Sequence, residues 1–167
     1  NINAPKVSFS YSSTATQNET RMGGLRFQNV GIPQGATVTS ARIDFTPAAS
    51  NNAPVTFSVK AEKVGDASIF TNASNLTSRL KTTAVSTWAA PDWTTENPPI
   101  PVEGPDVTTL VQEVVSLAGW CGNNGMAFYL EPTAGTGSRT AFSIDGAPGL
   151  QPTLTVKERL FPGILLL

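Results

Sequence analysis

The stretch 23–45, GGLRFQNVGIPQGATVTSARIDF, constrains the fold of this chain more than any other part. It holds two runs in which apolar and polar residues alternate, which is the signature of a strand with one buried face. Between the runs, residues 32–35 (IPQG) have turn chemistry, since proline fixes φ at the second position and glycine tolerates positive φ. We therefore expect a hairpin with five side chains on its buried face: Leu25, Phe27, Ala41, Ile43 and Phe45.

The segment 55–63, VTFSVKAEK, has the cleanest alternation in the chain, and we expect it to pair with 37–46 in an antiparallel sheet. The side chains predicted to face inward are Val55, Phe57, Val59 and Ala61. Further strands are predicted at 6–11, 84–88, 125–131, 139–145 and 153–157. The polar segment 66–83 is expected to be a long excursion with one helical turn, and 89–105, with its five prolines, an extended loop.

One amphipathic helix is predicted at about 106–118, because apolar residues there recur at the spacing of a helix face. Asp106 is a good N-cap, since its carboxylate can accept a backbone N–H of the first turn. Gly119 suits the left-handed position that commonly ends a helix. The expected buried face carries Val107, Leu110, Val111, Val114 and Leu117.

These patterns predict an all-β protein, a jelly-roll or Greek-key β-sandwich of about 8–10 antiparallel strands with one short helix. The 167 residues suit a single domain, which we place at 1–160. The apolar tail 161–167, FPGILLL, does not fit the alternation. It is either a strand or linker buried against something outside this chain, or a strand donated to a neighbouring subunit. Since the chain begins Asn-Ile-Asn, we expect a mature form or a piece of a longer protein.

The composition argues against several functions. Charged residues make up 14% of the chain against roughly 25% in typical soluble domains, the net charge is −1, and no basic stripe is visible, so we expect no nucleic-acid partner. No run approaches the ~18 apolar residues of a membrane span. There is no histidine and no recognisable catalytic motif, so we expect no enzyme and no certain cofactor.

Two kinds of binding residue are plausible on chemical grounds. Sugar rings stack on flat indoles, so Trp93 in the proline-rich loop, with Trp88, is the candidate ligand-binding platform; the alternative is that these indoles anchor the loop in the core. Jelly-roll modules often hold a structural Ca²⁺, which binds carboxylate and carbonyl oxygens; the candidate ligands here are Asp145, Asp44 and Glu131, although the sequence has no contiguous acidic loop pattern. Asp145 lies in an Ile-Asp-Gly turn and is better explained by a local side-chain turn.

Cys121 is the only cysteine, so the chain cannot form an internal disulfide. Free cysteine is among the most buried residue types, which favours a buried thiol. The alternative is one half of an intermolecular disulfide, or of a disulfide to a segment outside this sequence.

The order and spacing of several motifs resemble the DNRLRE-type jelly-roll domains of bacterial secreted and surface proteins, which are related to carbohydrate-binding modules. The matching segments are 25–45, 88–93 (WAAPDW), 105–114 (PDVTTLVQEV), 124–130 (NGMAFYL), 139–143 (RTAFS) and 145–148 (DGAP). Residues 119–123 (GWCGN) look like the form found in large type IV pilus tip-adhesins.

The resemblance implies a β-sandwich, export to the bacterial surface and a non-catalytic role in adhesion or carbohydrate binding, with a glycan or another surface protein as the partner. It supplies no catalytic residue. The alternative function is a structural subunit or stalk domain of an extracellular filament or pilus-associated assembly, with self-association through 161–167.

Overall fold

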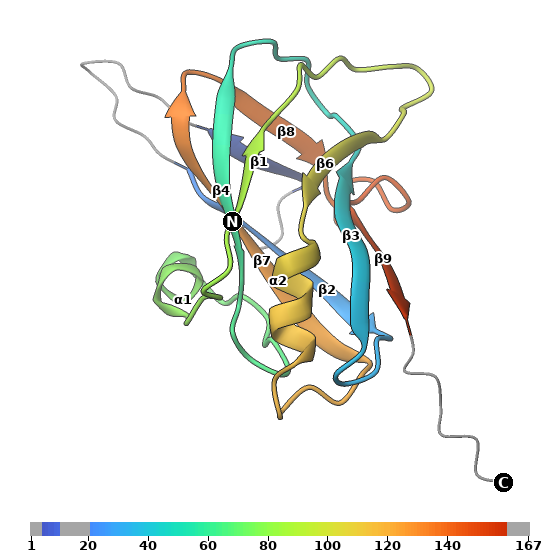
Figure 1. Ribbon diagram of the computed structural model, residues 1–167. Coiled ribbons are helices and arrows are strands. Elements are labelled where there is room, and N and C mark those ends of the chain that lie inside the picture. The colour runs from blue at the N-terminus through green and yellow to red at the C-terminus, as the bar shows by residue number, and fades with distance from the viewer. Residues whose placement is uncertain (1–4, 11–20, 160–167) are drawn as a thin grey trace, which may run out of the picture.

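The computed structural model describes residues 5–10 and 21–159, and within them the chain forms nine strands and two helices (Figure 1). The strands are β1 (Lys6–Ser10), β2 (Gly23–Val30), β3 (Thr37–Phe45), β4 (Val55–Ala61), β5 (Ser86–Ala89), β6 (Val102–Asp106), β7 (Asn124–Gly135), β8 (Ser138–Phe142) and β9 (Thr153–Arg159). The helices are α1 (Ala73–Ser78) and α2 (Thr108–Val115).

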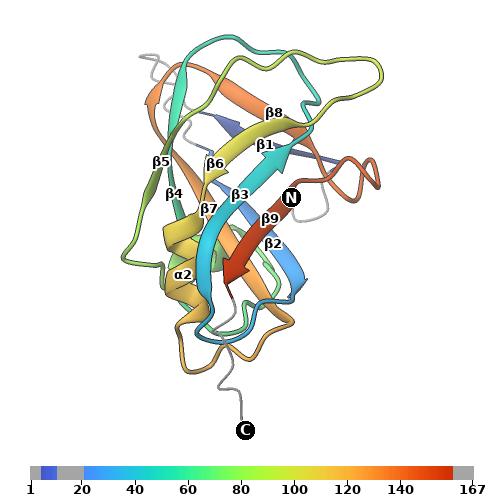
Figure 2. The ribbon, with the colours of Figure 1, turned by 45° about the vertical axis from the view of Figure 1, so that its right-hand side comes forward.

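The strands form an antiparallel β-sandwich, which confirms the predicted fold class. One sheet has the order β2-β7-β4-β5, and the other has the order β6-β3-β9, with its three strands side by side in Figure 2. A short β1-β8 pair adds a third element, and β8 also contacts the residues that follow β3 through a bridge between Pro47 and Ala141. Valine, isoleucine and phenylalanine fill the inward positions of these strands, as suits a pleated surface with one buried face.

The stretch 23–45 has the predicted burial but not the predicted hairpin. All five of its expected inward side chains lie in the hydrophobic core or pack against it. However, β2 pairs with β7 while β3 pairs with β6 and β9, so the two strands belong to opposite sheets. The turn between them spans Pro33 to Ala36, with Gly35 at φ +71°, as the third position of a type II turn requires.

The predicted pairing of 37–46 with 55–63 is wrong for the same reason. β4 lies between β7 and β5, and its four inward residues are buried as expected. Period-2 alternation specifies which face of a strand is buried, and both sheets of a sandwich bury a face against the same core. The pattern therefore predicts burial without choosing the partner strand.

Helix α2 is shorter than predicted and begins differently. Its N-cap is Val107, one residue after Asp106, which ends β6. The expected carboxylate interaction is still present, because the Thr108 N–H donates to Asp106 Oδ1 at 2.8 Å. At the other end the C-cap is Ser116 in the right-handed conformation, and Gly119 does not adopt positive φ. The predicted last turn, 116–118, is not α-helical.

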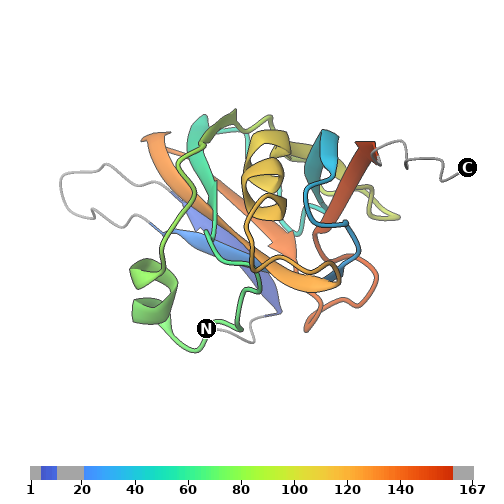
Figure 3. The ribbon, with the colours of Figure 1, turned by 60° about the horizontal axis from the view of Figure 1, so that its bottom comes forward.

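α2 closes one flank of the sandwich, between β3 of one sheet and β4 of the other (Figure 3). Its buried side chains, Leu110, Val111, Val114 and Val115, have no solvent exposure. Its polar side chains satisfy backbone groups of both layers. Gln112 accepts from Val38 N–H at 2.8 Å and donates to Ala36 C=O, and Thr108 Oγ1 accepts from Ala41 N–H at 2.9 Å. Glu113 accepts from the N–H groups of Thr83 and Ala84, just before β5.

The proline-rich loop contains a strand that the sequence did not predict. β6 includes Pro105, and proline is tolerated there because β6 is an edge strand and need not donate on both sides. The other predicted strands are present with shifted ends, and β7 extends to Gly135 through the segment predicted to be a loop.

Residues 62–81 cover part of the outer face of the four-stranded sheet and include the predicted helical turn, α1. Arg79 holds this segment in place: it forms an ion pair with Glu62 at 2.8 Å, donates to Ser68 C=O, and lies over the Phe70 ring. The Tyr129 hydroxyl also contacts Glu62, and burial together with that neighbouring charge raises the pKa of Tyr129. In the part of the chain that the structure describes, neither helix has the length and apolar character that a bilayer crossing requires.

Replacing Gln112 with alanine will destabilise the fold, because Val38 N–H and Ala36 C=O both lose their partner. A part-buried backbone group left unsatisfied costs roughly 1–3 kcal/mol, so we expect a loss of about 2 kcal/mol in urea unfolding. Thr109→Ala, at an exposed position of the same helix, is the control and should change stability by less than about 0.5 kcal/mol. Equal effects of the two substitutions would contradict this role of Gln112.

Glu113 makes stability depend on acid pH. Burial acts to raise the pKa of its carboxyl, but the hydrogen bonds from Ala84 and Thr83 and the ion pair with Lys63 outweigh burial and hold that pKa below its ordinary value. A carboxyl with a lowered pKa in the folded state stabilises the fold above its unfolded-state pKa and loses that contribution as the pH falls. The stability advantage of the wild type over Glu113→Gln should therefore shrink between about pH 6 and pH 3, measured by urea unfolding. A stability difference between the wild type and Glu113→Gln that does not change with pH would contradict this role of Glu113.

Candidate functional site

The two tryptophans expected to form a ligand platform lie inside the molecule. Trp93 is 1% exposed and Trp88 8% exposed, so neither offers an open indole face to a sugar. Both belong to an aromatic cluster in the core, in which Trp88 stacks on Phe45 at 5.7 Å and Trp93 lies 5.6 Å from the same ring. This burial corrects the expectation of a surface platform. The physical reason is that the loop folds back over the sandwich, where Trp93 pairs with Asn51 through two backbone hydrogen bonds.

Arg139, on β8, holds this loop in place through hydrogen bonds to its backbone. The side chain is fully buried, and its guanidinium donates to the carbonyl oxygens of Ala53, Ala90, Pro91 and Ser138 at 2.8–3.0 Å. Burial lowers the pKa of Arg139, and the nearby charge of Asp92 partly offsets that effect. Arginine suits this position because its planar fork presents five donors in fixed directions. In the sequence, Arg139 stands only at the start of a predicted strand, and nothing there indicates this role.

The three candidate calcium ligands are not brought together. Within the described residues, no group of three or more acidic, histidine or cysteine side chains is placed to hold a metal ion. Glu131 is exposed on β7, beside Ser58 of β4, and Asp145 lies in the turn after β8. Asp44 is on β3, in the opposite sheet, where its carboxylate binds Arg42 through Nε at 2.6 Å and Nη2 at 3.2 Å.

Cys121 is exposed, which corrects the expectation of a buried thiol. Its sulfur lies 3.8 Å from Gly119 C=O, after the segment that follows α2. The proposed disulfide to another chain or segment stays a prediction.

The outer face of the β6-β3-β9 sheet carries a polar hollow of about 330 Å³, which we call the polar face. It consists of Ser40, Arg42, Asp106, Thr155 and Lys157, with the Ala41 backbone beneath them. Strand register accounts for this grouping, because Arg42 lies directly opposite both Asp106 and Thr155, and Ser40 lies opposite Lys157. Directly opposed residues on one face of an antiparallel sheet are close enough to act on one ligand.

Arg42 is the fixed centre of the polar face. It forms ion pairs with Asp44 and with Glu103. The hydrogen bond to Asp44 is the main reason that the pKa of Arg42 lies above its ordinary value. The carboxylates of Asp44 and Glu103 are therefore engaged by the Arg42 cation and not by a metal ion.

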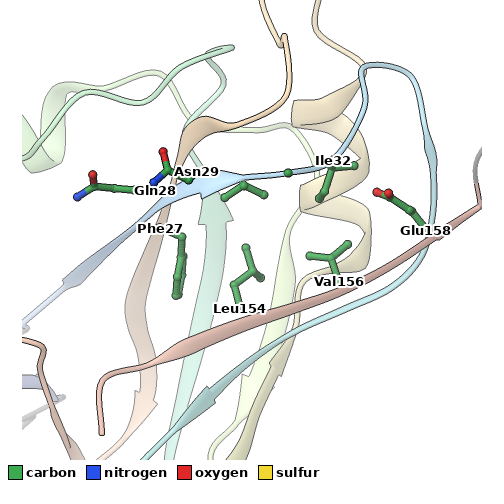
Figure 4. Close-up of a pocket in the computed structure, with 9 residues that line it drawn as sticks. Phe27, Gln28, Asn29, Ile32, Leu154, Val156 and Glu158 are labelled. Carbon is green, nitrogen blue, oxygen red and sulfur yellow. The ribbon is translucent and has the colours of Figure 1, made fainter. Parts of the chain in front are cut away.

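A second hollow of about 370 Å³ lies between β2 and β9, and we call it the β2/β9 groove (Figure 4). Its lining mixes apolar and polar residues, and the apolar part consists mainly of Leu154 and Val156 of β9, which face Phe27 of β2. The remaining lining residues are Gln28, Asn29, Val30, Gly31, Ile32 and Glu158.

An irregularity in β2 adds apolar side chains to this groove. The pairing of β2 with β7 shifts between Phe27 and Val30, and Asn29 there adopts φ 54°, a left-handed conformation that asparagine tolerates better than most residues. The extra residue lets Phe27 and Val30 both pack against the core, although strict alternation would place them on opposite faces.

Sequence reasoning did not find either hollow. The alternation in 37–46 placed Arg42 and Asp44 on the polar side of a strand, but only the pairing with β6 and β9 brings Asp106, Thr155 and Lys157 beside them. The sequence does not indicate the groove either, because Leu154 and Val156 alternate with polar residues as the inward side chains of any strand do. A comparison of the chain with protein-family models, curated proteins and solved structures gives no match.

Arg139→Lys will destabilise the fold although it preserves the charge. A lysine amine cannot reproduce the fork, so several of the carbonyl oxygens that Arg139 binds lose their donor at a cost of roughly 1–3 kcal/mol each. We expect a loss of at least about 2 kcal/mol in chemical unfolding. The control is Arg159→Lys at an exposed position of β9, which should be near neutral. Similar results for the two variants would show that the fork geometry is unimportant.

Proposed function

We propose that this chain is a non-catalytic binding module of an extracellular bacterial surface protein, and that its polar face binds carbohydrate. The observation that carries the proposal is the grouping of Arg42, Asp106, Thr155 and Lys157 in one shallow hollow on a sheet face. A sugar presents hydroxyls that both donate and accept hydrogen bonds. The polar face matches them, because Arg42 and Lys157 donate, Asp106 accepts, and Thr155 does both.

Preorganisation supports this proposal. Arg42 is held by Asp44 and Glu103, so little side-chain freedom is lost when a ligand contacts it. Among the described residues that line the polar face there is no aromatic ring, so recognition there would depend on hydrogen bonds and not on ring stacking. Hydrogen-bonded sugar sites without stacking are shallow and of modest affinity, which suits adhesion through many copies.

The extracellular location is part of the proposal and depends on the resemblance to DNRLRE-type jelly-roll domains, including those of type IV pilus tip-adhesins. The β-sandwich and the low charge content agree with that setting. The absence of histidine from the sequence and the engagement of Asp44 and Glu103 by Arg42 favour binding over catalysis.

A structural role in a filament or pilus-associated assembly is the second candidate function. The β2/β9 groove favours it, since partly exposed apolar side chains of both strands meet there, and such a flank is a typical site for association.

The carbohydrate proposal predicts binding on a glycan array that depends on the polar face. Lys157→Ala and Thr155→Val should each weaken binding to the best glycan at least about tenfold, equivalent to roughly 1.4 kcal/mol, measured by titration calorimetry. The matched control is Lys60→Ala, which removes the same charge from the outer face of the other sheet and should leave binding unchanged. Absence of any bound glycan, or equal effects of Lys157→Ala and Lys60→Ala, would refute the proposal.

A further inference from the structure

The two flanks of the sandwich differ in how they are closed. α2 covers the flank between β3 and β4, where its side chains satisfy the backbone of both layers. On the other flank, β2 and β9 are the outer strands of their sheets, and within the described residues no strand pairs with their outer edges. An exposed strand edge is a template for pairing with another segment.

The β2/β9 groove lies on this open flank, and its apolar side chains are in contact with the hydrophobic core. Phe27, Val30, Leu154 and Val156 are partly exposed, yet each packs against the buried core cluster. Glu158 lines one end of the groove, on the same inward face of β9 as Leu154 and Val156. Its Oε2 atom is buried and accepts no hydrogen bond from the described residues. The groove therefore suits an apolar segment that also brings a hydrogen-bond donor.

We propose that the β2/β9 groove binds residues 161–167 of a second copy of this chain as an added strand. The segment, FPGILLL, carries six apolar side chains and no charge, and it supplies the backbone N–H groups that an exposed strand edge and Glu158 require. This inference is independent of carbohydrate binding and gives the structural alternative above a physical basis.

Turn chemistry favours a second copy over the same chain. The turn signal available for folding back onto β9 is Pro162-Gly163. The turns that Pro-Gly favours splay the two strands of a hairpin, because the twist of these turns does not match the twist of the strands.

A segment from another molecule has no such restriction. Seven extended residues span roughly 20 Å from the first to the last at ~3.3 Å per step, while the five residues of β9 from Leu154 to Glu158 span about 13 Å. The segment can therefore cover the whole groove. Reciprocal exchange between two copies gives a dimer, and one-way donation gives a chain of subunits.

The test uses the full chain in sedimentation velocity over a range of concentrations up to about 1 mM, where even weak contacts are detected. A reductant is included because Cys121 is exposed and could link two copies covalently. We expect concentration-dependent association of the wild type. Val156→Lys, in the groove, and the double change Leu165→Asp with Leu166→Asp, in the donated segment, should each weaken association at least tenfold.

The matched control is Thr155→Lys, which places the same charge one residue away on the opposite face of β9 and should associate like the wild type. Mixing the two defective proteins provides a second test that does not depend on either variant alone. Val156→Lys keeps an intact donor segment, and the double variant keeps an intact groove, so their mixture should form a complex with one copy of each.

Three results would overturn the proposal: a wild type that stays monomeric, a Val156→Lys variant that associates like Thr155→Lys, or a mixture that forms no mixed complex. These results are distinct from failure of the carbohydrate proposal, because that proposal concerns Lys157 and Thr155 on the outward face of β9, while Val156 points inward.

Discussion

The packing of α2 between the two sheets is the contact on which the rest of the sandwich depends. A sandwich whose chain crosses repeatedly between sheets leaves backbone groups unpaired where strands diverge. Gln112 and Thr108 satisfy such groups along β3, and Glu113 satisfies those before β5. Since buried backbone groups without partners are costly, this short helix does more than fill space with its valines and Leu110.

Closure of one flank by α2 leaves the molecule asymmetric, and the asymmetry separates two candidate surfaces. β9 contributes to both of them. Its outward residues, Thr155 and Lys157, belong to the polar face, while its inward residues, Leu154 and Val156, line the β2/β9 groove. Because successive side chains of a strand point to opposite faces, one edge strand can serve a hydrogen-bonding surface and an apolar one at once. The two surfaces can therefore be altered independently by neighbouring substitutions.

The candidate site was harder to predict than the fold, and Trp93 shows why. Its position in a proline-rich loop suggested exposure, but the loop returns across the sandwich and places the indole against Phe45. Asp44 is a second example. Its carboxylate suggested a metal ligand, whereas its pairing with Arg42, two residues away, uses both carboxylate oxygens. In each case the decisive partner was set by the path of the chain and not by the residue type.

The sequence by itself determined the fold class, the inward residues of the main strands and most of the apolar face of α2, which Val115 completes. These follow from local periodicity, because a strand or helix must bury its apolar side wherever it packs. Only the tertiary structure decided that β2 and β3 lie in opposite sheets, that Arg42 meets Asp106 and Thr155, and that no described strand closes the flank between β2 and β9. Periodicity is blind to these features, since strands of either sheet bury the same kind of face against one shared core.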